Sequence, residues 1–278
     1  MTAVPIRARR VDPVVLATAG VITVLVLAAV LAPVLPVADP DAVDLAYPYA
    51  GPSAAHPLGT DGSGRDLLAR LVYGARSGLL GPLIVVLLAT LTGTAVAVAA
   101  AWRGGWVDAV VSRVCDVLFA FPSLLLAMLA VSLFGSGLLP GAIALAVGST
   151  PYIMRITRAV ALRECGQTYI AALVVQGQSG VRICVRHVVP VLLPFILSQA
   201  TISFGYATVN MSALSFLGLG VQPPTADWGA MVSTGQTGLI RGEPLEAILA
   251  AGVIALAVAS FTVLGERLLA AAENHPHR

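Results

Sequence analysis

The stretch SGLLGPLIVVLLATLTGTAVAVAAA, from Ser77 to Ala101, contains no charged residue. An α-helix needs about 20 consecutive apolar residues to cross a bilayer, so this stretch is long enough to span one. Hydrophobic residues make up 58% of the 278-residue chain and charged residues only 11%, whereas soluble proteins carry about 25% charged residues. A soluble fold would therefore lack a polar surface, and the sequence predicts an integral membrane protein.

Five further charge-free stretches flank this one: Pro13–Val37, Val117–Ser136, Gly137–Met154, Val188–Ala226 and Ala247–Gly265. Two of them follow each other at once, which predicts a tight hairpin at Phe134–Gly137. The stretch Val188–Ala226 is longer than one helix needs, so we expect an interruption within it. The sequence therefore predicts an all-α, polytopic membrane bundle of six transmembrane helices.

The distribution of arginine predicts the orientation of these helices. If the N-terminus is inside, twelve arginines face the cytoplasm: Arg7, Arg9, Arg10, Arg103, Arg113, Arg155, Arg158, Arg163, Arg182, Arg186, Arg267 and Arg278. Only four face outward: Arg65, Arg70, Arg76 and Arg241. Because cytoplasmic loops carry the excess of basic residues, both termini are expected inside. Trp102, Trp106 and Trp228 fall at predicted helix ends, a usual place for interfacial tryptophan.

Three regions follow from this topology. Residues 1–76 form an N-terminal tail, the first transmembrane helix and an extracytoplasmic segment. Residues 77–270 form a five-helix core with a cytoplasmic loop at 155–187, and residues 271–278 form a C-terminal tail. A cleaved signal peptide is the alternative for the first helix, but its apolar stretch exceeds the usual length of about 7–15 residues.

The cytoplasmic loop contains a predicted short helix from Tyr169 to Gln176. Gly177 is placed to end this helix, and Ser179 to cap the next one. A short helix across the mouth of a bundle can fit a groove on a partner protein. It can equally be an inert connector, and the residues alone leave both interpretations open.

The segment HPLGTDGSGRD, from His56 to Asp66, precedes the charge-free stretch Ser77–Ala101. Its Asp-Gly and Ser-Gly pairs predict tight turns, and Asp61 or Ser63 could cap the following helix. Arg65 and Asp66 are expected to pair with each other or with a neighbouring loop; as exposed ions they would add little stability. The glycines lack the spacing and the lysine of a phosphate-binding loop. Further along, Gly218 and Gly220 allow a helix break, and Pro223-Pro224 prevents continuation.

The cytoplasmic loop resembles the EAA loop of binding-protein-dependent importer permeases, the membrane subunits of ABC transporters. The segments at His56–Arg76 and Asn210–Met231 resemble motifs of the dipeptide, oligopeptide and nickel branch. The loop differs from the family pattern at two positions: Ala171 stands where the family has an acidic residue, and Val174 stands where it has an arginine. The resemblance implies that the residues that couple the permease to the ATPase are Tyr169, Ala171, Ala172, Gly177, Ser179, Arg182, Arg186 and His187. It also implies an outer motif, on the extracytoplasmic side, made of His56, Gly59, Asp61, Gly64, Arg65 and Asp66.

The resemblance further implies a permease subunit of an ATP-driven peptide importer that works by alternating access in the bacterial inner membrane. A nickel or metal-chelate importer is the alternative within the branch. Implied partners are a second homologous permease, two ATPase subunits, an extracytoplasmic binding protein and lipid. ATP and Mg²⁺ are used by the partners, so this chain is expected to bind no cofactor or metal and to catalyse no reaction itself.

Other classes of function fit the sequence less well. A stand-alone channel or carrier would need intramembrane charges, which are nearly absent; a non-transporting scaffold subunit is a further alternative. The net charge of +2 gives no indication of nucleic-acid binding. Cys115, Cys165 and Cys184 have no metal-ligand spacing and are expected to be free thiols. Asp116 is expected either at the interface beside Arg113 or along the transport pathway, and His275 and His277 in a solvated tail.

Overall fold

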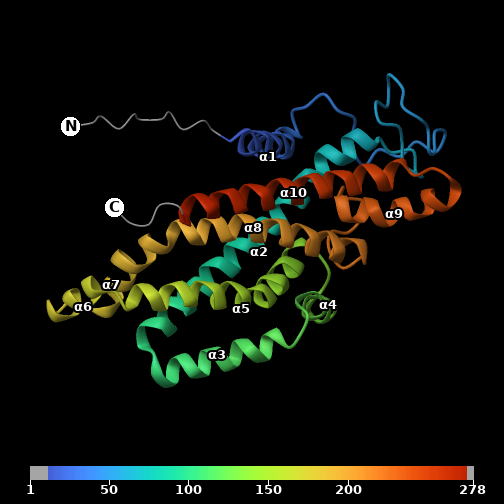
Figure 1. Ribbon diagram of the computed structural model, residues 1–278. Helices are drawn as coiled ribbons and strands as arrows, with labels where there is room; N and C mark the ends of the chain where they lie inside the picture. The colour runs from blue at the N-terminus through green and yellow to red at the C-terminus, as the bar shows by residue number, and fades with distance from the viewer. Residues whose placement is uncertain (1–11, 274–278) are drawn as a thin grey trace, which may run out of the picture.

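The computed structural model describes residues 12–273, and within this range every regular element is a helix (Figure 1). The predicted cytoplasmic arginines at 7, 9, 10 and 278, together with His275 and His277, lie outside the described residues. The helices are α1 (Pro13–Leu31), α2 (Leu67–Arg103), α3 (Gly105–Phe119), α4 (Ser123–Phe134), α5 (Leu138–Cys165), α6 (Thr168–Val175), α7 (Gly180–Ile183), a π-helical turn (Cys184–Val188), α8 (Val189–Phe216), α9 (Trp228–Arg241) and α10 (Leu245–Glu273).

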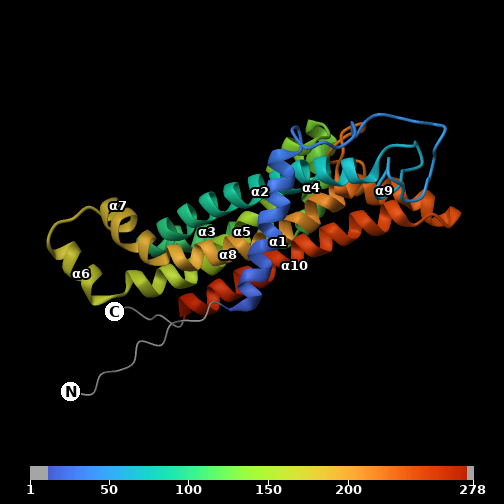
Figure 2. The same ribbon diagram turned by 90° about the horizontal axis from the view of Figure 1, so that it is seen from above.

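The bundle is built on two extensive helix pairs, α2 with α5 and α8 with α10. Glycine lets these helices approach closely, as is common in membranes. A Cβ on Gly93 of α2 would lie 3.0 Å from Ile153 of α5, and one on Gly265 of α10 would lie 2.6 Å from Ile202 of α8. Figures 1 and 2 show α1 on the outside of the bundle, where it crosses α10 obliquely.

Four helical runs are long and apolar enough to cross a membrane: 13–31, 67–103, 180–216 and 245–272. A fifth span exists if α3 and α4 are taken together, although they meet at an angle of 81°. The protein is thus a polytopic helical membrane protein, as predicted. The prediction of one continuous helix over Val117–Ser136 is wrong, because Pro122 lacks an N–H donor and disfavours helix in the residue before it.

The other predicted boundaries are partly confirmed. The hairpin forms where α4 ends at Phe134 and α5 begins at Leu138, and its Gly135 and Gly137 adopt φ angles of 101° and 146°. α5 then continues to Cys165, so residues 155–165 belong to a helix and the predicted loop at 155–187 is too long. The interruption expected within Val188–Ala226 is confirmed: α8 ends at Phe216, and Gly218 follows with φ 74°.

The two ends of the bundle carry different elements. α6 and α7 project from one end, whereas α9 and the segment between α1 and α2 lie at the other (Figures 1 and 2). An ion pair of 3.0 Å between Asp12 and Arg267 fixes the start of α1 beside the last turns of α10. These two helix ends point toward the end of the bundle that carries α6 and α7.

Candidate functional site

The outer motif folds into a compact polar turn around Asp61. The carboxylate of Asp61 is 1% exposed and accepts hydrogen bonds from the backbone N–H of Ser63 at 2.8 Å and of Arg65 at 2.9 Å. It also accepts a bond from Arg65 Nε at 2.8 Å. Gly64 has φ 76°, and a Cβ there would lie 1.8 Å from the Asp44 carbonyl oxygen. Gly64 is therefore required for both its dihedral angle and its close approach to Asp44.

Asp66 caps α2 in place of the predicted Asp61 or Ser63. One carboxylate oxygen accepts the N–H of Ala69 at 2.7 Å, and the other lies 2.9 Å from His56 Nδ1. The predicted Arg65–Asp66 pair does not form, because Arg65 pairs with Asp61 instead. Asp61 and Asp66 are also buried rather than exposed, so their loss would leave polar partners unsatisfied in the interior. Gly59 has φ 83°, and a Cβ there would lie 2.5 Å from the Ala50 carbonyl oxygen.

Arg70 and Trp228 join this turn to the rest of the bundle end that carries the outer motif (the outer end, named after the predicted location of that motif). Arg70 is 3% exposed, donates to the Pro40 carbonyl at 3.1 Å, and lies 3.8 Å from Asp61. Trp228 is 1% exposed and donates its Nε1–H to the Leu71 carbonyl at 2.9 Å. Trp228 lies at the start of α9, a helix end as predicted, but its ring is buried within the protein. The outer end is a packed polar unit whose buried members could not be identified from sequence, since their partners are distant along the chain.

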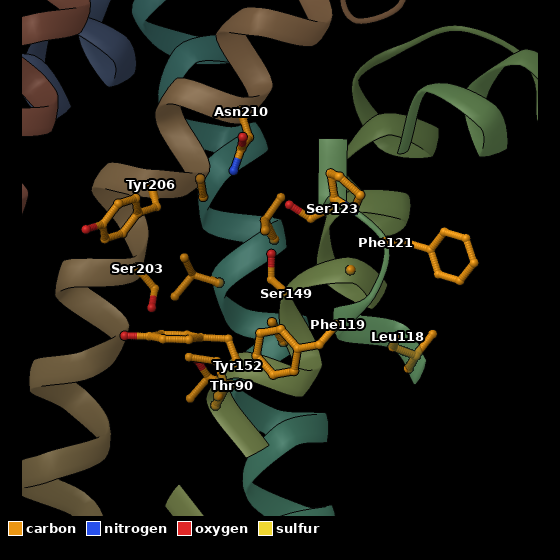
Figure 3. A pocket seen from close by; sticks show the side chains of 17 residues that line it. Thr90, Leu118, Phe119, Phe121, Ser123, Ser149, Tyr152, Ser203, Tyr206 and Asn210 are labelled. Atoms are coloured by element: carbon orange, nitrogen blue, oxygen red, sulfur yellow. The ribbon is translucent and has the colours of Figure 1, made fainter. Parts of the chain in front are cut away.

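An open cavity of about 400 Å³, the central cavity, lies midway along α2, α5 and α8, beside the break between α3 and α4 (Figure 3). It reaches the surface of the chain, since Phe121 and Tyr206 in its lining are 56% and 64% exposed. Phe119 is the last residue of α3 and Phe121 lies within the break; in Figure 3 the Phe119 ring lies beside Tyr152, whereas the Phe121 ring points away from it. No charged residue is found among the described residues that line the cavity. Its polar lining is neutral: Thr90, Ser123, Ser149, Tyr152, Ser203, Tyr206 and Asn210.

Sequence reasoning missed this cavity, although a signal for it exists. Ser203, Tyr206 and Asn210 are spaced at i, i+3 and i+7, which places them on one face of α8. Ser149 and Tyr152 share a face of α5 in the same way. In Figure 3 the Tyr152 ring lies across the space between α5 and α8. Regular spacing of neutral polar residues inside an apolar stretch is thus the pattern that could have found the site.

Two ion pairs hold α3 against α5 beside the cavity. Arg155, one turn after the cavity residue Tyr152, binds Asp116 at 2.7 Å, and its guanidinium lies 4.9 Å from the centre of the Phe119 ring. Arg158 binds both carboxylate oxygens of Asp108. Asp116, whose place the sequence left open, therefore pairs with Arg155 across to α5.

At the opposite end from the outer motif, α6 is held by few contacts. Its Ile170 is 2% exposed, whereas Val174 and Val175 are 51% and 89% exposed. The Tyr169 hydroxyl donates a hydrogen bond to the carboxylate of Glu164, which is buried at the end of α5. Burial, together with this bond, raises the pKa of Tyr169 to about 12. α6 is therefore anchored on one side and exposes an apolar surface on the other.

The predicted coupling residues occupy two surfaces. Tyr169, Arg186 and His187 line a hollow of about 490 Å³ with Glu164, whereas Ala171 and Ala172 are exposed on α6. The predicted helix end is confirmed, because α6 stops at Val175 and Gly177 adopts φ 79°. Ser179 occupies the expected N-cap position of α7, but its side chain makes no capping bond, and Arg182 is exposed on α7.

The described part of the chain contains neither a metal-binding cluster nor a disulfide. Residues 12–273 contain no group of three or more His, Cys, Asp or Glu side chains that could hold a metal ion. Cys115, Cys165 and Cys184 are free thiols.

The family of the chain follows from comparison with known proteins. A family profile described as the binding-protein-dependent transport system inner membrane component matches residues 79–273. This match covers most of the helical core, including the cavity and α6. The chain belongs to this family, and it is a multi-pass inner membrane component of such a system.

Individual relatives are permeases of peptide systems. The chain is 37% identical over 250 residues to the dipeptide transport system permease protein DppC of Alkalihalophilus pseudofirmus, covering 89% of this chain and 81% of that protein. It is 37% identical over 218 residues to the glutathione transport system permease protein GsiD of Pectobacterium atrosepticum, covering 78% and 72%. It is 34% identical over 225 residues to the probable D,D-dipeptide transport system permease protein DdpC of Escherichia coli, covering 81% and 76%.

Proposed function

We propose that this chain is a permease subunit of an ATP-driven importer of short peptides, working by alternating access. The observation that carries the proposal is the placement of α6. It projects from one end of the bundle, is anchored through Ile170, and presents Val174 and Val175 to a partner. The names of the relatives favour peptides over nickel as the transported class.

The proposal includes six membrane crossings with both termini in the cytoplasm. The crossings are α1, α2, the α3–α4 pair, α5, α8 and α10. The Asp12–Arg267 ion pair supports a common side for the start of α1 and the end of α10, and the excess of arginine at that end supports the cytoplasm as this side. The outer motif would then face the extracytoplasmic binding protein.

Coupling to ATP hydrolysis would run through α6 and α5. An ATPase subunit that closes on ATP would displace α6, and the bond from Tyr169 to Glu164 would carry that displacement to the end of α5. α5 lines the central cavity, so its movement would change access to the cavity. Ala171 and Val174 replace the charges of related loops, and apolar contact would therefore supply most of the binding to the ATPase.

The complete assembly would contain a second, homologous permease, two ATPase subunits and an extracytoplasmic binding protein. To test the proposal, the chain is purified with these subunits and reconstituted into liposomes with ATP enclosed. We expect uptake of a dipeptide only when both ATP and the loaded binding protein are present. Solute flux through the purified chain alone, without ATPase or binding protein, would show instead a stand-alone channel or carrier.

A further inference from the structure

The central cavity described above has a feature that its apolar surroundings do not explain. Ser203 and Asn210 are half-buried and make no hydrogen bond within the described part of the chain; Tyr206 makes none either, but it is 64% exposed. Thr90 Oγ1 at the cavity is buried and also lacks a partner. A buried hydroxyl without a partner is costly in a protein interior, so Thr90, with the half-buried Ser203 and Asn210 at the same cavity, indicates a ligand or water that satisfies these groups.

Neighbouring hydroxyls of the same helix provide a direct contrast. Ser198, Thr201 and Thr208 of α8 each donate to the carbonyl four residues earlier, at 2.8, 2.9 and 2.8 Å. None of these three lines the cavity. On α8, therefore, these hydroxyls away from the cavity are satisfied by their own helix, whereas the side chain of Ser203 is left free on the cavity face.

From these observations we propose that the cavity is a contact site for the peptide backbone during passage, an inference that rests on the proposed function. Hydroxyl and amide side chains both donate and accept hydrogen bonds, which matches the N–H and C=O groups of a peptide bond. A neutral lining offers no counter-charge, so a substrate's charged termini stay hydrated or lie at the rim near Arg155 and Asp116. Such a site holds many peptide sequences weakly, and a weak hold lets the substrate leave.

The position of the cavity suits this role. It lies near the middle of α2, α5 and α8, and the non-helical residues Phe121 and Pro122 form part of its wall. Non-helical backbone at such depth is stable only where it is buried in protein or faces a watery space. The α3–α4 break is thus both a wall of the cavity and the place where the wall can change shape.

The test uses the complete reconstituted transporter with L-Ala-L-Ala, glutathione and a D,D-dipeptide as separate probes. The variants are Ser203→Ala and Asn210→Ala, singly and together, and the matched control is Thr201→Val on the same helix. We expect peptide uptake to fall about 3- to 10-fold in the double variant, because two hydrogen bonds to the substrate are lost. The Thr201→Val control, whose side chain does not line the cavity, is expected to transport at the parent level.

A second measurement does not depend on the double variant folding. Asn210→Cys and Thr201→Cys are labelled with a thiol reagent in the assembled transporter, with the parent's own cysteines as the baseline. We expect a transported probe to slow labelling at position 210 and not at 201. If the parent transports a probe while Ser203→Ala and Asn210→Ala transport it normally and position 210 is not protected, the cavity assignment is overturned and the importer function stands. If the parent transports none of the probes, the peptide function and the cavity assignment fall together.

Discussion

At the scale of single residues, the outer turn depends on the absence of a side chain at Gly64, and the attachment of α6 to α5 depends on the side chain of Tyr169. Gly64 is needed where the outer turn passes the Asp44 carbonyl with a positive φ. Tyr169 is needed where α6 is tied to Glu164 of α5. Both positions were identified from motif resemblance, but neither the contact with Asp44 nor the bond to Glu164 could be read from the sequence.

Gly64→Ala is expected to destabilise the outer end. Its Cβ would collide with Asp44, and a positive φ is strained for alanine, which together cost about 1–3 kcal/mol. The control is Gly252→Ala in α10, where a Cβ meets no atom within 4 Å. Thermal unfolding in detergent measures the effect; equal melting temperatures for the two variants would contradict the geometry at Gly64.

Tyr169→Phe is expected to reduce the peptide transported per ATP, because Glu164 loses its hydrogen-bond partner. Folding raises the pKa of Tyr169 to about 12, above the usual value of about 10. The stabilisation is thus fully present below about pH 10 and is lost as the pH rises toward 12. The defect of the variant should therefore be constant from about pH 6 to 9; a defect that appears only at one end of that range would assign the effect to another group.

At the scale of elements, the break between α3 and α4 is the least expected part of the fold. The apolar stretch around Pro122 predicted one helix, since proline is tolerated in membrane helices when neighbours satisfy the freed carbonyl. The structure instead bends the chain by 81° and ties α3 to α5 through the Arg155–Asp116 and Arg158–Asp108 pairs. These pairs link α5 to α3, and Phe119, which lines the cavity, is the last residue of α3.

Breaking the Arg155–Asp116 pair is expected to disturb coupling more than stability. Arg155 and Asp116 are 62% and 53% exposed, so the pair contributes only about 0–1 kcal/mol to folding. Asp116→Arg should raise ATP hydrolysis that is not accompanied by uptake, and adding Arg155→Asp should restore tight coupling. ATPase and uptake assays on the same liposomes provide the ratio. A double variant as uncoupled as the single one would rule out a role for this ion pair.

At the scale of the whole molecule, composition alone predicted a polytopic membrane protein, because the hydrophobicity of a stretch can be calculated without knowing which residues it contacts. The hairpin at residues 134–137 and the end of α6 before Gly177 were also predictable, since glycine acts locally. The caps, the buried Asp61 and Trp228, and the central cavity were not. Each depends on partners from distant parts of the chain, such as Leu71 for Trp228.

The most direct test of the account is the change Val175→Asp at the exposed apolar surface of α6. Val175 is 89% exposed in the isolated chain, so the change should not disturb folding. If α6 docks in a groove of the ATPase, a buried carboxylate there would cost about 2 kcal/mol or more and weaken association about 30-fold or more.

The matched control is Val43→Asp, an exposed valine on the segment between α1 and α2 at the other end of the bundle. Copurification of the ATPase with the tagged permease, followed by peptide uptake, provides the measurement. The account predicts loss of both with Val175→Asp and retention of both with Val43→Asp. Full ATPase association and transport in Val175→Asp would contradict the central claim that α6 couples this permease to its ATPase.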